Sequence, residues 1–289
     1  MARAEAGAGA PAVRACPLGC AEPGSALGEL DKTAGFALSR ERYTLALCGC
    51  GKLVYLSPAP SEADLRAMYV DHGQFGEEYT DAARVKAILD YIGQCFDRLS
   101  KAGGWAAPVR VLEVGAGLAW MCRAAKVRDQ AHFTVAQDVS PEALAACPWV
   151  DRYVQAEVGD PRIAANGPYQ LISMTHVIEH LVDPAAVVRK CRALLAADGF
   201  IFITAPHRPR GWREGDMQAW RAYSYNHVPA HIQYFSEASM RRLAQASGCE
   251  LAYWSHDHEG GEAFEAWLAP ASTAPRAPWW RRMVASLRG

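Results

Sequence analysis

The stretch VLEVGAGLAW, residues 111–120, joins a short apolar run to a loop that contains two glycines. This pattern predicts a buried strand, a tight turn and the start of a helix. Gly115 and Gly117 let the backbone turn sharply, and they let a ligand approach without meeting a Cβ atom. Glu113 sets a negative charge directly before the loop. Because loops that bind phosphate normally avoid such a charge, the stretch favours a ligand without phosphate groups.

Short apolar runs alternate with helical patterns on both sides of this stretch. The alternation predicts an α/β fold with a mostly parallel sheet wrapped by helices. The helices are expected at 81–101, 118–128, 140–147, 184–196 and 236–247, and the strands at 109–114, 132–138, 151–156, 169–175, 199–206, 250–255 and 262–269. Ser61 with Asp64 three residues later is a capping signature that predicts one more helix start.

Composition changes along the chain suggest its organisation. We expect a flexible leader rich in Ala and Gly at 1–15, a small module with two cysteine pairs at 16–60, and the α/β domain at 61–271. Within that domain, residues 206–235 form an insertion rich in Trp, Tyr, His and Arg, and a basic tail follows at 272–289. The length suits one full domain plus an appendage.

The overall charge excludes some classes of function. The formal net charge of -1 gives no basic face for duplex nucleic acid. The sequence has no run of eighteen apolar residues and no apolar core of a secretory signal, so a transmembrane segment is not expected. Five of the nine cysteines are scattered singly, as is typical of small buried side chains in a reducing compartment. A cytoplasmic protein is therefore expected; the oligomeric state is left open.

Three classes of ligand compete for the glycine loop. A dinucleotide loop would carry a further small residue where Trp120 stands, and a P-loop would need Gly-Lys-Ser/Thr, which is absent. S-adenosylmethionine brings no phosphate and carries a positive sulfonium, which tolerates Glu113. Asp138 ends the next expected strand, where its carboxylate can accept both ribose hydroxyls.

From about residue 84 to 255 the chain resembles the class I S-adenosylmethionine-dependent methyltransferases. VLEVGAG (111–117) resembles their first motif, AQDVSPEAL (136–144) their second, and residues 169–206 the region of their fourth and fifth strands. HIQYFSEASMRRLAQASGCEL (231–251) resembles the branch that includes ubiquinone-pathway O-methyltransferases and sugar methyltransferases. The resemblance implies a Rossmann-like sheet of seven strands with helices on both faces. The family's third loop glycine is replaced by Ala119, and the acidic residue before its fourth strand by Gln170.

The resemblance also implies a cofactor site and an activity. The residues expected to bind S-adenosylmethionine are Glu113, Gly115, Ala116, Gly117, Asp138, Val139, Met174, Thr175 and His176. The expected reaction is methyl transfer to an oxygen or carbon of a small-molecule acceptor, a sugar or secondary metabolite, free or linked to a nucleotide or a carrier. The alternatives are a non-catalytic scaffold on the same fold and a metal-dependent O-methyltransferase.

Histidines supply candidate catalytic groups. His176, His180 and His231 are the candidate bases, because a histidine of near-neutral pKa can take the acceptor's proton. If the turn is helical, the spacing of His176, Glu179 and His180 puts them on one face. Related O-methyltransferases hold a divalent ion with Glu-x-x-Glu-His and a later His, so a metal site is a second interpretation. A third is that Glu179 and His180 only order the loop.

The first four cysteines form the pairs CPLGC (16–20) and CGC (48–50). They resemble the two knuckles of a zinc ribbon, although the usual spacing is two residues within each pair. The resemblance implies structural zinc held by Cys16, Cys20, Cys48 and Cys50. A ribbon without metal and a redox role stay open.

The aromatic insertion allows two interpretations. It could close over the acceptor as a lid, or its rings could pack as ordinary core. Its arginines, Arg208, Arg210, Arg213 and Arg221, could meet a phosphate or carboxylate of the acceptor or face solvent.

Overall fold

The computed structural model describes residues 13–33, 38–50, 52–69, 81–106, 108–140, 147–258 and 261–271. The tail at 272–289, most of the leader and residues 141–146 of the expected helix at 140–147 lie outside the described residues. None of the described helices has the length and apolar character needed to cross a membrane.

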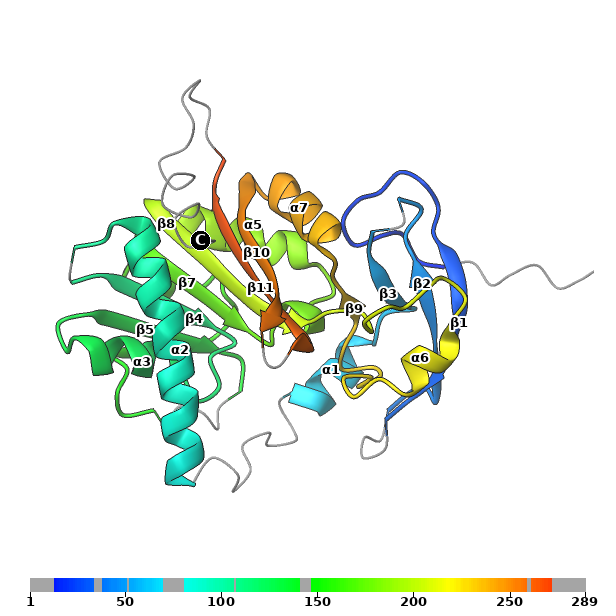
Figure 1. The fold of residues 1–289 in the computed structure, drawn as a ribbon, viewed down its shortest axis with the longest axis horizontal. Coiled ribbons are helices and arrows are strands. Elements are labelled where there is room, and N and C mark those ends of the chain that lie inside the picture. Colours follow the sequence, from blue (N-terminus) through cyan, green and yellow to red (C-terminus); the bar gives the residue numbers. More distant parts are fainter. Residues whose placement is uncertain are drawn as a thin grey trace, which may run out of the picture.

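A seven-stranded sheet forms the larger part of the molecule (Figure 1). Its strand order is β10-β11-β8-β7-β4-β5-β6, with β4 to β8 parallel and β11 antiparallel to both of its neighbours. The strands are β4 (Arg110–Val114), β5 (Phe133–Asp138), β6 (Arg152–Gln155), β7 (Tyr169–Thr175), β8 (Leu195–Pro206), β10 (Cys249–His258) and β11 (Ala263–Pro270). The expected fold class, a mostly parallel α/β sheet of seven strands, is confirmed.

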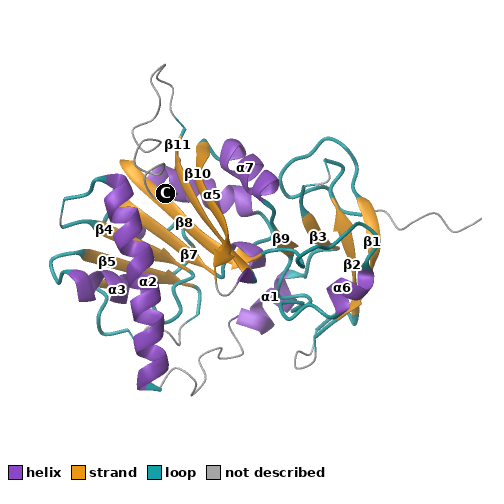
Figure 2. Cartoon of the chain, viewed as in Figure 1, coloured by secondary structure: helices purple, strands orange, loops and turns teal. Residues whose placement is uncertain are grey.

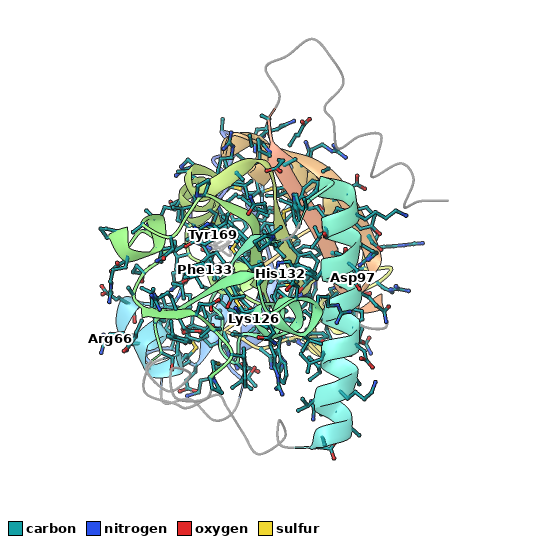
Figure 3. All side chains as sticks on the ribbon, turned by 90° about the vertical axis from the view of Figure 1, so that its left-hand side faces the viewer. Arg66, Asp97, Lys126, His132, Phe133 and Tyr169 are labelled. Carbon is teal, nitrogen blue, oxygen red and sulfur yellow. The ribbon has the colours of Figure 1, made fainter. Side chains whose placement is uncertain are left out.

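Helices cover both faces of this sheet. On one face lie α2 (Ala82–Gly103) and α3 (Trp120–Arg128), which share a hydrophobic core with the sheet. In the turned view of Figure 3, His132 lies next to α2, where its ring packs against Phe96 at a centroid distance of 5.3 Å. On the other face lie α5 (Pro184–Leu194) and α7 (Glu237–Ala246). The short α4 (Pro161–Ala164) precedes β7.

Helix boundaries differ from the expected ones by one or two residues. Helix α3 begins at Trp120 instead of residue 118, because Ala119 adopts a left-handed conformation with φ 52°. Helix α5 ends at Leu194, and the next two residues already belong to β8. The capping signature of Ser61 is confirmed, since its hydroxyl accepts the N–H of Asp64 at the start of α1 (Glu62–Tyr69).

A second, antiparallel sheet has the order β1-β2-β3-β9 and stands apart from the large one, as the orange strands of Figure 2 show. Its strands are β1 (Ser25–Asp31), β2 (Arg42–Leu47), β3 (Val54–Ser57) and β9 (Gln233–Tyr234). The last strand comes from the aromatic insertion, together with α6 (Met217–Arg221). Trp220 and Tyr234 are fully buried in the core of this small sheet. These aromatic rings therefore pack as core, the second of the two interpretations above.

Hydrogen bonds and apolar contacts connect the cysteine-containing segment to the part of the chain that forms the large sheet. The Ser236 hydroxyl donates to the Lys52 carbonyl at 2.8 Å, and the Arg242 guanidinium donates to the carbonyls of Leu18 and Gly19. Residues from both sheets also belong to one hydrophobic cluster. The cysteine-containing segment is thus packed against α7, the helix before the last two strands of the large sheet.

Candidate functional site

The glycine loop lies at the carboxyl end of β4. From β4 the chain continues to β5 and β6 on one side of the sheet, and β7 and β8 lie on the other side. In an open α/β sheet, ligands bind in the crevice at such a reversal of strand order. Gly115 and Gly117 have φ values of 59° and 49°, and a Cβ on Gly115 would lie 2.6 Å from Val177 Cγ2. The loops after β4 and β7 therefore pack closely enough to require glycine.

Glu113 supports the loop from inside the protein. Its side chain is 3% exposed, and its two carboxylate oxygens accept the N–H groups of Met121 and Cys122 in the first turn of α3. Burial raises the pKa of Glu113 to about 7, although these two hydrogen bonds lower it. The negative charge next to the loop is thus bound to a helix N-terminus. This capping contact is not visible in the sequence motif, and it gives a structural reason for an acid directly before the loop.

Asp138 and Val139 lie at the carboxyl end of β5, next to the loop. The Asp138 oxygens accept the N–H groups of Gly117 at 2.8 Å and Ser140 at 2.9 Å. A carboxylate has about four acceptor positions, so each oxygen keeps one for a further donor. Val139 is 39% exposed and is one of few large apolar side chains exposed among the described residues. Together they offer hydrogen-bond acceptors next to an apolar surface, which suits a nucleoside.

The other expected cofactor residues surround the same edge. Ala116 is buried, and its N–H donates to the Gln137 carbonyl at 2.9 Å. Met174 is fully buried in the core, whereas Thr175 and His176 are half-buried. The structure thus brings the carboxyl ends of β4, β5 and β7 together, as the sequence analysis expected, and leaves the role of each residue as a prediction.

Next to this edge, two histidines lie close to a buried carboxylate. Ligand atoms of Glu179, His180 and His231 all lie within 4.8 Å of one another. Glu179 and His180 are part of a 3₁₀ turn, Ile178–His180, while His176 precedes the turn with φ 53°. The expectation that His176, Glu179 and His180 share one face of an α-helix is therefore wrong. His176 still reaches the carboxylate, because its Nδ1 lies 3.3 Å from Glu179 Oε1.

Hydrogen bonds fix the orientation of two of these histidines. Nδ1 of His180 lies 2.8 Å from the Ala230 carbonyl and 2.7 Å from the Tyr69 hydroxyl, and Nδ1 of His231 lies 2.8 Å from the Tyr225 carbonyl. Since a carbonyl oxygen only accepts, each Nδ1 carries the proton. In the neutral rings, Nε2 then presents its lone pair. This is the arrangement of histidines that act as bases or bind metals.

The electrostatics of this cluster are unusual. Glu179 is 0% exposed, and neither of its oxygens has a hydrogen-bond donor within the described part of the chain. Burial alone would raise the pKa of Glu179, but attraction to His180, His176 and His231 outweighs burial and lowers it to about 2. Burial lowers the pKa of His231 to about 4, so that this ring is neutral at pH 7. The surrounding histidines are therefore what stabilises the charge of Glu179.

The four expected cysteines meet at one end of the small sheet. Sγ atoms of Cys16, Cys20 and Cys48 lie within 4.8 Å of one another, and Cys50 Sγ is 3.0 Å from those of Cys20 and Cys48. All four are free thiols. A hydrogen bond between Cys16 and Cys48 lowers the pKa of Cys16 and raises that of Cys48 to about 12. The irregular spacing of the pairs thus does not prevent the sulfurs from converging.

Tyr69 is a site residue that the sequence analysis missed. It ends α1, far from the histidines in the sequence, and its hydroxyl contacts His180 Nδ1 and donates to the Ala230 carbonyl. Burial raises its pKa far above the ordinary tyrosine value, so the hydroxyl keeps its proton. No local motif identifies such a residue, because only the packing of α1 against the loop after β7 brings it there.

Comparisons with known proteins agree with this geometry. A family model described as a methyltransferase domain matches residues 83–253. The ubiquinone biosynthesis O-methyltransferase of Xylella fastidiosa (strain M23) is 33% identical over 128 residues, which cover 42% of this chain and 48% of that protein. Its counterpart in Vibrio campbellii is 30% identical over 56 residues, 19% of this chain and 24% of that protein. The chain thus spans about half the length, or less, of these curated relatives.

A solved structure shares the fold. It is a chain from the complex between the Haloferax volcanii Trm112 methyltransferase activator and a methyltransferase, with a TM-score of 0.50 and 12% sequence identity. The match covers 67% of this chain and 97% of that chain. At this identity the likeness concerns the fold alone.

Proposed function

Since the chain belongs to the class I S-adenosylmethionine-dependent methyltransferases, we propose that it methylates an oxygen or carbon of a small-molecule acceptor, a sugar or secondary metabolite. The observation that carries the proposal is the crevice at the reversal of strand order, with the left-handed glycine loop on one side and Asp138 on the other. The proposal keeps the cytoplasmic location that composition suggests.

The residues of this crevice fit the cofactor. The free acceptor positions of Asp138 would take the two ribose hydroxyls, and exposed Val139 would pack against the adenine. Gly115 and Gly117 would let the methionine portion approach the backbone. Glu113 would act indirectly, by holding the start of α3 behind the loop.

When bound, S-adenosylmethionine supplies a methyl group on a positively charged sulfur, which an in-line nucleophile displaces. The protein's own part is to position the acceptor, exclude water and remove the acceptor's proton. His180 is our first candidate for the base, because its Nδ1–H is held by the Ala230 carbonyl and Nε2 is left to accept. His231 is held in the same way, but its pKa of about 4 makes it the weaker base. His176 lies on the same edge.

A titration with S-adenosylmethionine tests the proposal. We expect wild-type protein to bind it with micromolar affinity, and Asp138→Ala to weaken binding at least tenfold, since a hydrogen bond to a charged group contributes about 1.5–3 kcal/mol. Asp198→Asn is the matched control, because Asp198 is exposed near the amino end of β8. Isothermal titration calorimetry measures both.

Absence of binding by the wild-type protein at millimolar concentration would contradict the proposal. Binding without release of S-adenosylhomocysteine over a broad panel of acceptors would support the alternative of a non-catalytic scaffold.

The buried Glu179 carboxylate, surrounded by histidines, favours a second candidate function, a metal-dependent O-methyltransferase. Glu179, His180 and His231 offer one carboxylate oxygen and two Nε2 lone pairs within 4.8 Å. The Nδ1–H groups bond to carbonyls, as in most histidines that bind metals. The residues thus fit a divalent ion, which would polarise an acceptor hydroxyl. Because imidazole nitrogens outnumber oxygens, a transition metal suits the set better than magnesium.

Manganese binding distinguishes a metal-dependent methyltransferase from one that works without a metal ion. We expect Mn²⁺ to bind the wild-type protein and Glu179→Gln to reduce its affinity at least tenfold, as read from the free-ion signal in electron paramagnetic resonance. Mn²⁺ is chosen because thiolates select it poorly, so the cysteine cluster does not compete. Exposed Glu157→Gln is the control. Equal Mn²⁺ binding by Glu179→Gln, or none by wild type at millimolar concentration, would exclude the metal site.

The cysteine cluster fits structural zinc. A tetrahedral site with Zn–S bonds of 2.3 Å needs sulfurs about 3.8 Å apart. Two of the observed separations are 3.0 Å, so these sulfurs would need to part by less than 1 Å. We assign Cys16, Cys20, Cys48 and Cys50 as the ligands of this proposed site, whose role would be to fold the module and not to perform chemistry.

A further inference from the structure

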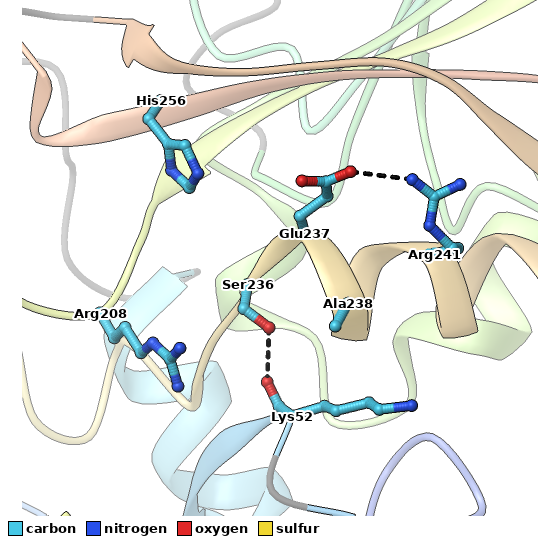
Figure 4. Close-up of a pocket in the computed structure, with 7 residues that line it drawn as sticks. All are labelled: Lys52, Arg208, Ser236, Glu237, Ala238, Arg241 and His256. Atoms are coloured by element: carbon cyan, nitrogen blue, oxygen red, sulfur yellow. Dashed lines mark hydrogen bonds and ion pairs between the residues drawn. The ribbon is translucent and has the colours of Figure 1, made fainter. Parts of the chain in front are cut away.

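Cationic side chains line a hollow of about 440 Å³ where the small sheet meets the large one (Figure 4). They come from four separate parts of the chain: the turn between β2 and β3, the loop after β8, helix α7 and the last part of β10. The basic residues are Lys52, Arg208 and Arg241, and the ring of His256 lies beside them. Their convergence is notable in a chain whose formal net charge is only -1.

The charges in this hollow are not balanced. Its acidic residue, Glu237, is paired with Arg241 at 2.8 Å, one turn further along α7. Neither Lys52 nor Arg208 has an ion-pair partner among the residues that the structure describes. Two full positive charges are therefore left for a ligand.

The hollow lies on the ligand-binding edge of the large sheet. Arg208 follows the carboxyl end of β8, and β10, which carries His256 near its end, runs parallel to β8. Strand β8 is two places from β4 in the sheet, which corresponds to about 10 Å along this edge. A ligand that extends along the edge can thus reach from the glycine loop towards the hollow.

The walls of the hollow are fixed in place. Ser236 donates to the Lys52 carbonyl at 2.8 Å, and it also caps α7 by accepting the N–H of Ser239. The first turn of α7 therefore faces the hollow with its positive end, while the Lys52 backbone is held against it. The site needs no rearrangement of the two sheets to present its cations.

We propose that this hollow binds a phosphate or diphosphate group carried by the methyl acceptor. The inference rests on the proposed function, because it assumes an acceptor whose other end reaches the glycine loop. Arg208 offers the planar fork of donors that matches phosphate oxygens, and Lys52 adds a mobile point charge. A group with two negative charges would neutralise both.

Calorimetric titration with inorganic pyrophosphate and with ADP tests the assignment. We expect both to bind the wild-type protein, and Arg208→Ala and Lys52→Ala each to weaken binding about tenfold. Arg213→Ala is the matched control, since Arg213 is exposed in the same segment and does not line the hollow; its affinity should equal that of wild type. Tighter binding of ADP than of pyrophosphate would identify a nucleotide-linked acceptor, and equal binding an acceptor that carries phosphate directly.

The same samples are titrated with S-adenosylmethionine. If it binds while pyrophosphate and ADP do not, the phosphate site is overturned and the proposed function stands. An equal loss of affinity in Arg213→Ala would also overturn the site, because the attraction would then be nonspecific. Failure of S-adenosylmethionine itself to bind would instead contradict the proposed function.

Discussion

At the scale of single residues, Glu113 shows how far a local pattern carries. Its position before the glycine loop could be read from the sequence, and its charge led to the expectation that the loop binds a ligand without phosphate groups. Its hydrogen bonds with the N–H groups of Met121 and Cys122 could not be predicted from the sequence, because they depend on where α3 begins. The same holds for Glu179, because the histidines around its carboxylate come from separate parts of the chain.

The raised pKa of Glu113 predicts a specific pH dependence of stability. Burial raises it from 4.5 to about 7, so between these values the unfolded chain releases the proton before the native state does. Stability therefore falls as pH rises through this window. Glu113→Gln loses one helix hydrogen bond at every pH but carries no such penalty. The stability advantage of wild type over Glu113→Gln should thus shrink by roughly 3 kcal/mol from pH 4.5 to above pH 7.

Urea denaturation at a series of pH values measures this difference. Exposed Glu157→Gln should follow the wild-type curve throughout. If the free energy of unfolding depended on pH in the same way for wild type and Glu113→Gln, the Glu113 carboxyl group would have the same pKa in the folded and unfolded states, and the prediction would be wrong.

At the scale of elements, the two cysteine turns form one cluster although their spacing is irregular. The turn before β1 and the turn between β2 and β3 face each other because β1, β2 and β3 pair in order. Strand pairing thus sets the sulfur positions more strongly than the number of residues within each pair. The helices and strands expected from apolar periodicity and capping residues differ from the observed ones at their ends, whereas β1, β9 and α6 were not expected from the sequence.

Zinc binding is the prediction that belongs to these turns. We expect one zinc ion per wild-type chain and its loss in Cys48→Ser, measured by elemental analysis of purified protein. Cys249→Ala removes a thiol far from the cluster in the sequence and should keep its zinc. Free zinc at about 100 times its Kd should stabilise wild type by about 2.7 kcal/mol, and Cys48→Ser much less. A wild-type chain that takes up no zinc would leave a ribbon without metal.

At the scale of the whole molecule, segments far apart in the sequence complete each other. Residues 206–235 follow the fifth parallel strand, yet their aromatic rings fill the core of the N-terminal sheet, and β9 extends that sheet. The small sheet is thus built from segments that precede and follow the parallel strands in the sequence. The hollow with Lys52 and Arg208 exists only because of this arrangement.

Trp220 tests this shared core. Its side chain is fully buried between α6 and the small sheet, so Trp220→Ala should lower the free energy of unfolding by about 3–5 kcal/mol. Trp105 is half-buried and packs at the large sheet, so Trp105→Ala should lower the free energy of unfolding by less than Trp220→Ala does. Urea denaturation gives the loss, and hydrogen exchange should show faster exchange in β2 and β3 for Trp220→Ala alone. Unchanged exchange there would mean that the aromatic segment does not support the small sheet.

The sequence by itself determined the α/β class, the glycine loop, the acid at the next strand end and the family, because each depends on local periodicity or on short motifs in order. Only the tertiary structure decided that Glu113 caps a helix, that Tyr69 holds His180, and that the aromatic segment completes the small sheet. These features depend on contacts between residues far apart in the chain, and burial and hydrogen-bond partners are properties of the packed molecule that no local pattern encodes.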